Sequence, residues 1–121
     1  MKYMLLIYHG EETWNERTET ERQQIYREYR ELIDELKANG KYLAGDQLQS
    51  TSTANSVQVR GGKPMITDGP FAETREQLGG YYLIEARDLD EAIGIAERIP
   101  PARVGTIEIR PVMEITGLPA E

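Results

Sequence analysis

Two short segments of this sequence are apolar or aromatic at nearly every position, and they constrain the fold more than any other feature. They are residues 2–8 (KYMLLIY) and residues 81–86 (YYLIEA), and the first stops abruptly at His9-Gly10. Segments of this length suit strands better than helices, and an unbroken apolar run is typical of a strand covered on both faces. We therefore expect two central strands in a sheet that needs cover on both sides.

Two further segments have the spacing of amphipathic helices, residues 18–39 and residues 88–99. The first begins at overlapping capping-box candidates, Thr18-x-x-Glu21 and Thr20-x-x-Gln23, and ends at Asn39-Gly40. The second has Asp88 as its expected N-cap and stops before two prolines. The predicted buried stripes are Ile25, Tyr29, Leu32, Ile33 and Leu36 in the first helix and Leu89, Ala92, Ile93, Ala96 and Ile99 in the second.

Shorter strands fill the rest of the pattern. Residues 41–49 form a strand interrupted at Gly45-Asp46, residues 57–67 form a hairpin around Gly61-Gly62, and residues 104–115 alternate between apolar and polar positions. The order predicts an α+β fold, a ferredoxin-like βαββαβ arrangement with an extra β-hairpin, in one domain that spans residues 1–121.

Two helices cover only one face of such a sheet. Met4, Leu6 and Tyr8 alternate with Tyr3, Leu5 and Ile7, so the second face of the first strand is apolar as well. Left in water, such side chains would each forgo about 1.5–3 kcal/mol of burial. We therefore expect a homodimer in which the two sheets stack, a dimeric α/β-barrel.

The composition excludes several classes of function. With 14 Lys and Arg against 21 Asp and Glu the formal net charge is −7, which argues against binding to nucleic acid or to an anionic membrane surface. The sequence has no cysteine, which excludes a thiol nucleophile and a cysteine-ligated metal. The N-terminal apolar run is too short to export or anchor a protein, so we expect a cytoplasmic protein.

The segment 68–86, DGPFAETREQLGGYYLIEA, resembles the signature of the YCII-related superfamily, in the branch named for its Asp-Gly-Pro-Phe (DGPF) motif. The resemblance extends to residues 2–8, 43–45, 57–60, 88–92 and 107–112. It implies a dimeric ferredoxin-like barrel and a family of largely undefined activity. Some members resemble companions or fusion partners of extracytoplasmic-function sigma factors, and others are proposed to be small enzymes.

Better-studied YCII-like members are proposed to use a His on the first helix and an Asp before a Pro after the second helix. Here the segment 20–39 contains no His, with Glu28 near that place, and Arg98-Ile99 precedes the prolines without an Asp. The His and Asp pair is therefore not transferred to this chain.

The DGPF segment has both a structural and a functional interpretation. Asp-Gly-Pro-Phe forms a tight turn whatever its role. As a site, Asp68 would face a pocket between sheet and helices, either as a ligand-binding group or paired with Glu73 as a general acid or base. The predicted ligand-binding residues are Tyr8, Asp68, Phe71, Glu73, Gln77 and Tyr81.

His9, the only histidine, lies at the end of the first strand, where strand ends often line a cleft. It is either a second catalytic group beside Asp68 or an ordinary turn residue. Trp14 either caps the cavity mouth or packs against the following helix. No ligand loop for a metal and no phosphate-binding glycine motif is present, so we expect neither a metal nor a cofactor.

Three functions remain open at this point. The first is a homodimer that binds a small organic molecule. The second is a dimeric-barrel enzyme, namely an isomerase, a lyase or a cofactor-free oxygenase, that uses Asp68 and His9. The third is an accessory module of a sigma factor, which would bind through the acidic helix surface between Glu19 and Glu35.

Overall fold

The computed structural model describes residues 1–115 and has a four-stranded antiparallel sheet as its centre. The strands lie in the order β2 (Tyr42–Gln47), β5 (Gln77–Glu85), β1 (Lys2–His9) and β6 (Thr106–Pro111). Both apolar segments, now β1 and β5, occupy the two central places and pair with each other. This is the ferredoxin-like α+β arrangement that the sequence predicts.

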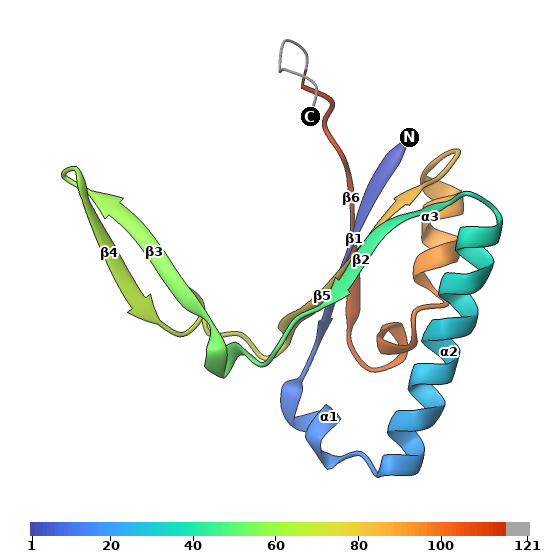
Figure 1. Ribbon diagram of the computed structural model, residues 1–121, viewed down its shortest axis with the longest axis horizontal. Coiled ribbons are helices and arrows are strands. Elements are labelled where there is room, and N and C mark those ends of the chain that lie inside the picture. Colours follow the sequence, from blue (N-terminus) through green and yellow to red (C-terminus); the bar gives the residue numbers. More distant parts are fainter. Residues whose placement is uncertain (116–121) are drawn as a thin grey trace.

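The longest helix, α2 (Glu19–Ala38), and the short helix α3 (Leu89–Ala96) lie on the same side of the sheet (Figure 1). They bury the side chains that β1 and β5 direct toward them. The resulting core consists of Tyr3, Leu5, Ile7, Leu32, Leu36, Tyr82, Ile84, Ala86, Ala92, Ile95 and Ile99. A 3₁₀ turn, η2 (Pro100–Arg103), follows α3 and leads into β6.

Local capping explains where both helices begin. Of the two candidate boxes, Thr18 with Glu21 forms: the Thr18 hydroxyl accepts from the Glu21 amide at 3.1 Å, and the Glu21 carboxylate accepts from the Thr18 amide at 2.9 Å. Asp88 caps α3 through the Glu91 amide, as expected. The predicted stripe of α3 is partly wrong, because Leu89 and Ile93 are exposed whereas Ile95 is buried.

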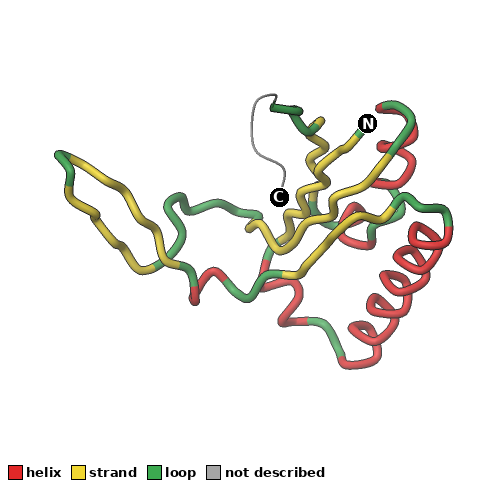
Figure 2. The backbone as a smooth tube through the Cα atoms, turned by 45° about the horizontal axis from the view of Figure 1, so that its top comes forward, coloured by secondary structure: helices red, strands yellow, loops and turns green. Residues whose placement is uncertain are grey.

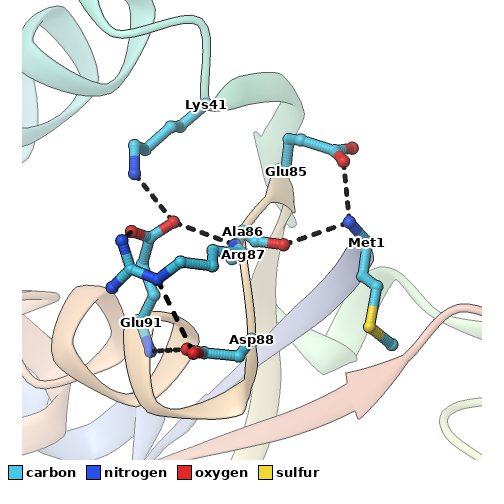
Figure 3. A network of polar contacts seen from close by, with 7 residues as sticks. All are labelled: Met1, Lys41, Glu85, Ala86, Arg87, Asp88 and Glu91. Carbon is cyan, nitrogen blue, oxygen red and sulfur yellow. Dashed lines mark hydrogen bonds and ion pairs between the residues drawn. The ribbon is translucent and has the colours of Figure 1, made fainter.

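A polar network joins the start of α3 to the chain terminus and to the start of β2 (Figure 3). The Glu91 carboxylate contacts the Lys41 ammonium at 2.7 Å and accepts from the Arg87 amide at 3.0 Å. The hydrogen bond from Lys41, followed by that from the Arg87 amide, lowers the pKa of Glu91 below its ordinary value. The network therefore ties the residue before β2 and the loop after β5 to the start of α3.

The predicted hairpin forms and projects from the rest of the molecule (Figures 1 and 2). It consists of β3 (Asn55–Arg60) and β4 (Lys63–Asp68), which pair only with each other. Gly61 and Gly62 both have positive φ, as a two-residue hairpin turn requires. We call residues 55–68 the arm. A short 3₁₀ turn, η1 (Thr51–Thr53), precedes it.

The sheet face opposite the helices has no covering element among residues 1–115 (Figure 1). The strand register places the half-buried Met4, Leu6 and Tyr8 of β1 beside Leu83, Tyr81 and Leu78 of β5 on this face. We call these six side chains the open face. The sheet therefore has the two-sided apolar character expected from the sequence, while the second copy that would cover the open face remains a prediction.

Helix α1 (Glu11–Glu16) was not expected, because the polar segment after His9 reads as a lead-in to the next helix. The last strand is also shorter than predicted, 106–111 rather than 104–115. The sequence also predicts that the last few residues are frayed, and residues 116–121 lie outside the described part of the chain. None of the helices within residues 1–115 combines the length and the apolar character needed to cross a membrane.

Candidate functional site

A cavity of about 510 Å³ lies where α1, α2 and η2 meet the ends of β1, β2 and β5. Its walls include four aromatic rings, Trp14, Tyr26, Tyr29 and Tyr82, and two Pro residues of η2. Polar groups at its edge include His9, Asp46, Arg17 and Arg103. Its volume lies within the range of about 300–1,000 Å³ typical of small-molecule sites.

A bulge in β5 makes room for His9 at the cavity. The register between β1 and β5 shifts after Ile7, which leaves Gly79 as the extra residue opposite the end of β1. A Cβ atom on Gly79 would lie 2.4 Å from His9 Nε2, so the imidazole occupies the space that a side chain there would need. The single histidine of the chain is thus held at the cavity by the backbone of the neighbouring strand.

Tyr29 and Tyr82 both line the cavity. Tyr29 and Tyr82 pack edge to face, with ring centroids 6.2 Å apart, and burial raises the pKa of each far above its ordinary value. Tyr42, by contrast, donates to the Gly45 carbonyl, whereas neither cavity hydroxyl has a protein partner within residues 1–115. Because both phenols stay protonated, they are hydrogen-bond donors available to a ligand.

Trp14 closes the side of the cavity nearest α2. Its ring packs edge to face on Tyr26, with centroids 5.6 Å apart, and the Arg22 guanidinium lies 5.6 Å from the Trp14 ring centroid. Arg22 also donates to the Trp14 and Asn15 carbonyls. Both interpretations of Trp14 therefore hold: it packs against the following helix and it lines the cavity.

Glu11, the first residue of α1, ties this helix to η1. Its carboxylate accepts hydrogen bonds from the Thr51 amide at 2.7 Å and from the Thr51 and Ser50 hydroxyls at 3.1 Å each. Burial alone would raise the pKa of Glu11, but these hydrogen bonds and the nearby His9 outweigh it, so the pKa lies below its ordinary value. Glu11 is therefore an ionised clamp, by which we mean that its carboxylate holds α1 to the segment that precedes the arm.

Glu11→Gln tests this clamp. A lowered pKa in the folded state gives stability that is present above the ordinary value of 4.5 and is lost as the pH falls through the folded pKa. We expect the variant to be less stable than the wild type by about 1 kcal/mol at neutral pH, with the gap closing at acidic pH. Urea unfolding at several pH values measures this, and the same change at exposed Glu12 is the control. A gap that is independent of pH would contradict the ionised clamp.

The structure places the predicted site residues in four different surroundings. His9 alone lines the cavity. Tyr8 and Tyr81 lie on the open face, where their hydroxyls donate to Glu108 at 3.4 Å and to Asp46 at 2.9 Å. Gln77 lies at the start of β5, where its side-chain oxygen accepts from the Glu11 amide at 3.1 Å and so holds α1.

Asp68 does not line this cavity in the single chain. Asp68 ends β4 at the base of the arm, is exposed, and accepts a hydrogen bond from the Asn55 side chain at 2.8 Å. Phe71 is 88% exposed and Glu73 is exposed too, so neither forms a pocket wall there. The physical reason is the direction of the arm, which carries the DGPF segment away from the helices. The chain bends at Gly69, which has φ +97.

The sequence reasoning missed most of the actual lining. The apolar spacing of the helix predicts Tyr29 as a core residue. That spacing does not distinguish a side chain packed within the core from one that lines a cavity at the edge of the core. Arg103 comes shortly after two prolines, which predict the end of a helix but do not indicate that the following residues line a cavity. Within residues 1–115, no cluster of three or more His, Asp and Glu side chains is arranged to hold a metal ion.

Comparison with known proteins identifies the family. The model of the YCII-related domain matches residues 1–116. The chain belongs to the YCII-related family. It is also 32% identical over 114 residues to an uncharacterised protein of Rhizobium meliloti strain 1021, a match that covers 93% of this chain and 92% of the relative. The resemblance drawn from the sequence is thus confirmed for the superfamily, and membership of the DGPF branch remains a prediction.

Proposed function

We propose that this YCII-related protein binds a small organic molecule in the cavity lined by His9, Trp14, Tyr29 and Tyr82. The observation that supports this most directly is the pair of unpartnered, protonated tyrosine hydroxyls on an otherwise aromatic wall. A ligand that accepts from these hydroxyls would gain hydrogen bonds that the single chain does not supply. The ligand that fits has a planar apolar part and at least one hydrogen-bond acceptor.

The protein acts as a homodimer in this proposal. Six apolar side chains on the open face lack cover in the single chain, and a two-fold partner would present the same six to them. The rim of this face supports the arrangement, because Glu108 and Arg110 of β6 both lie beside it and have opposite charges. A two-fold axis would allow each to approach its opposite on the second copy.

The assignment of Asp68, Phe71 and Glu73 to the ligand remains a prediction for the dimer. The single chain does not bring Asp68 and His9 into one cavity, so it offers no support for an enzyme that uses the two together. No residue of the described chain favours a sigma factor as partner over a second copy.

Ligand binding is tested through the only histidine and the only tryptophan, since both lie at the cavity. We expect members of a library of small aromatic acids, phenols and ketones to shift the imidazole signals of His9 in NMR spectra and to change Trp14 fluorescence. A tyrosine-to-phenylalanine change at Tyr29 removes one donor and should weaken the best binder about tenfold, the equivalent of one hydrogen bond.

The matched control makes the same tyrosine-to-phenylalanine change at a position outside the cavity. Tyr8→Phe removes a hydroxyl that already donates to Glu108 on the open face and should leave cavity binding unchanged. If no library member shifts His9, or if Tyr29→Phe and Tyr8→Phe have equal effects, the proposed cavity function is contradicted.

A further inference from the structure

The arm exposes more apolar surface than a free hairpin tolerates. Val57, Val59, Met65 and Ile66 are 53–70% exposed. Each strand of the arm has only the other as a neighbour, which leaves both outer edges unpaired. A two-stranded hairpin of this kind is marginally stable in water, and open edges invite further pairing. The arm therefore needs a partner surface.

The apolar side chains are concentrated on one face of the arm. Cross-strand pairing sets Val57 opposite Ile66 and Val59 opposite Pro64, and all four share a face because strand residues alternate. The opposite face carries Ser56 with Thr67, Gln58 with Met65 and, beside the turn, Arg60 with Lys63. The first set is an apolar strip that runs along the arm, and the second set is more polar.

The charge of the arm differs from that of the rest of the chain. Arg60 and Lys63 form the pair next to the turn, and Asp68 is the only acidic residue of the arm. Two basic residues and one acidic residue lie in the arm, which leaves 12 basic against 20 acidic residues elsewhere. A basic tip on a strongly acidic body is complementary to the body of another copy of the same chain.

We infer that the arm of each protomer lies on the body of a second copy, with its apolar strip buried and its basic tip against the partner's acidic surface. This rests on the proposed homodimer and goes beyond it, because sheet stacking alone leaves the arm in water. The arrangement is reciprocal, since a two-fold axis lays both arms down at once. If a different protein occupied this position, Lys63 would form no links between copies of the chain.

Zero-length carbodiimide cross-linking tests the inference on the full chain. The reagent joins the Lys63 amine to a carboxylate in contact with it, and a mixture of ¹⁴N-labelled and ¹⁵N-labelled protein identifies links between chains. We expect hybrid cross-linked peptides that pair Lys63 with Asp or Glu of the body, and their loss in Lys63→Gln. Links confined to one isotope, or no link from Lys63 in a protein that is dimeric by sedimentation, would overturn the arm inference alone.

A second measurement uses matched double variants of the arm. Val57→Ser with Ile66→Thr removes the centre of the apolar strip, and we expect the dissociation constant of the dimer to rise about tenfold or more. Gln58→Ser with Thr67→Ser changes the opposite face and should leave it unchanged. Equal dissociation constants for the two double variants would overturn the inference, and a monomeric wild type would overturn both the arm inference and the proposed homodimer.

Discussion

Gly105→Ala is expected to destabilise the protein by about 2–3 kcal/mol, the upper part of the range for overpacking, because the backbone beside Gly105 leaves no room for a methyl group. A Cβ atom on Gly105 would lie 2.1 Å from the Tyr8 carbonyl oxygen and 3.1 Å from His9 Cα. Both contacts are with backbone, so β6 has to move away from β1 just where Thr106 pairs with Tyr8. Urea unfolding measures the loss, and the His9 imidazole signals should shift as well.

The same substitution at Gly94 is the control, and the expected sign is opposite. Gly94 lies within α3, and a Cβ atom there would meet nothing within 4 Å. Since alanine favours a helix interior over glycine, Gly94→Ala should stabilise the protein by about 0.5–1 kcal/mol. Equal losses at Gly94 and Gly105 would show that the close approach of β6 to β1 is not what selects glycine.

Leu6→Glu is expected to abolish the homodimer at micromolar concentrations. Leu6 lies in the middle of the open face, between Tyr81 of β5 and Glu108 of β6. A two-fold interface would bury one new carboxylate from each copy without a cation, so the dissociation constant should rise about 100-fold or more. Light scattering during size-exclusion chromatography measures the mass.

Leu89→Glu is the matched control for this change. Leu89 is 49% exposed at the start of α3, on the helix side of the sheet, where an acidic residue suits the helix N-terminus. This variant should keep the mass of the wild type. A Leu6→Glu protein of unchanged mass would place the interface elsewhere.

The sheet and its two main helices were predictable because their signals are local. The Thr18 capping box, the Asp88 cap and the unbroken apolar run of β1 each determine their own element. Helix α1 was not predictable, since it has six residues, no buried position and no side-chain cap at Gly10. It forms because Gln77 and the η1 residues bind Glu11, and these contacts join distant parts of the chain.

The candidate site was predictable only at His9 and Trp14. A strand end is a frequent cleft position, and the β5 bulge that seats the ring is a tertiary feature. The bend at Gly69 was predictable, because Asp, Gly and Pro act locally. Whether Asp68 faces the helices depends on the direction of the arm, and the arm's own sequence does not determine that direction.

Sedimentation equilibrium of the wild-type protein tests the central claim most directly, namely that a sheet apolar on both faces covers its open face with a second copy. The account predicts a mass of twice 13.8 kDa at micromolar concentration. A mass of 13.8 kDa across the concentration range would contradict it, because the six side chains of the open face would then be left in water.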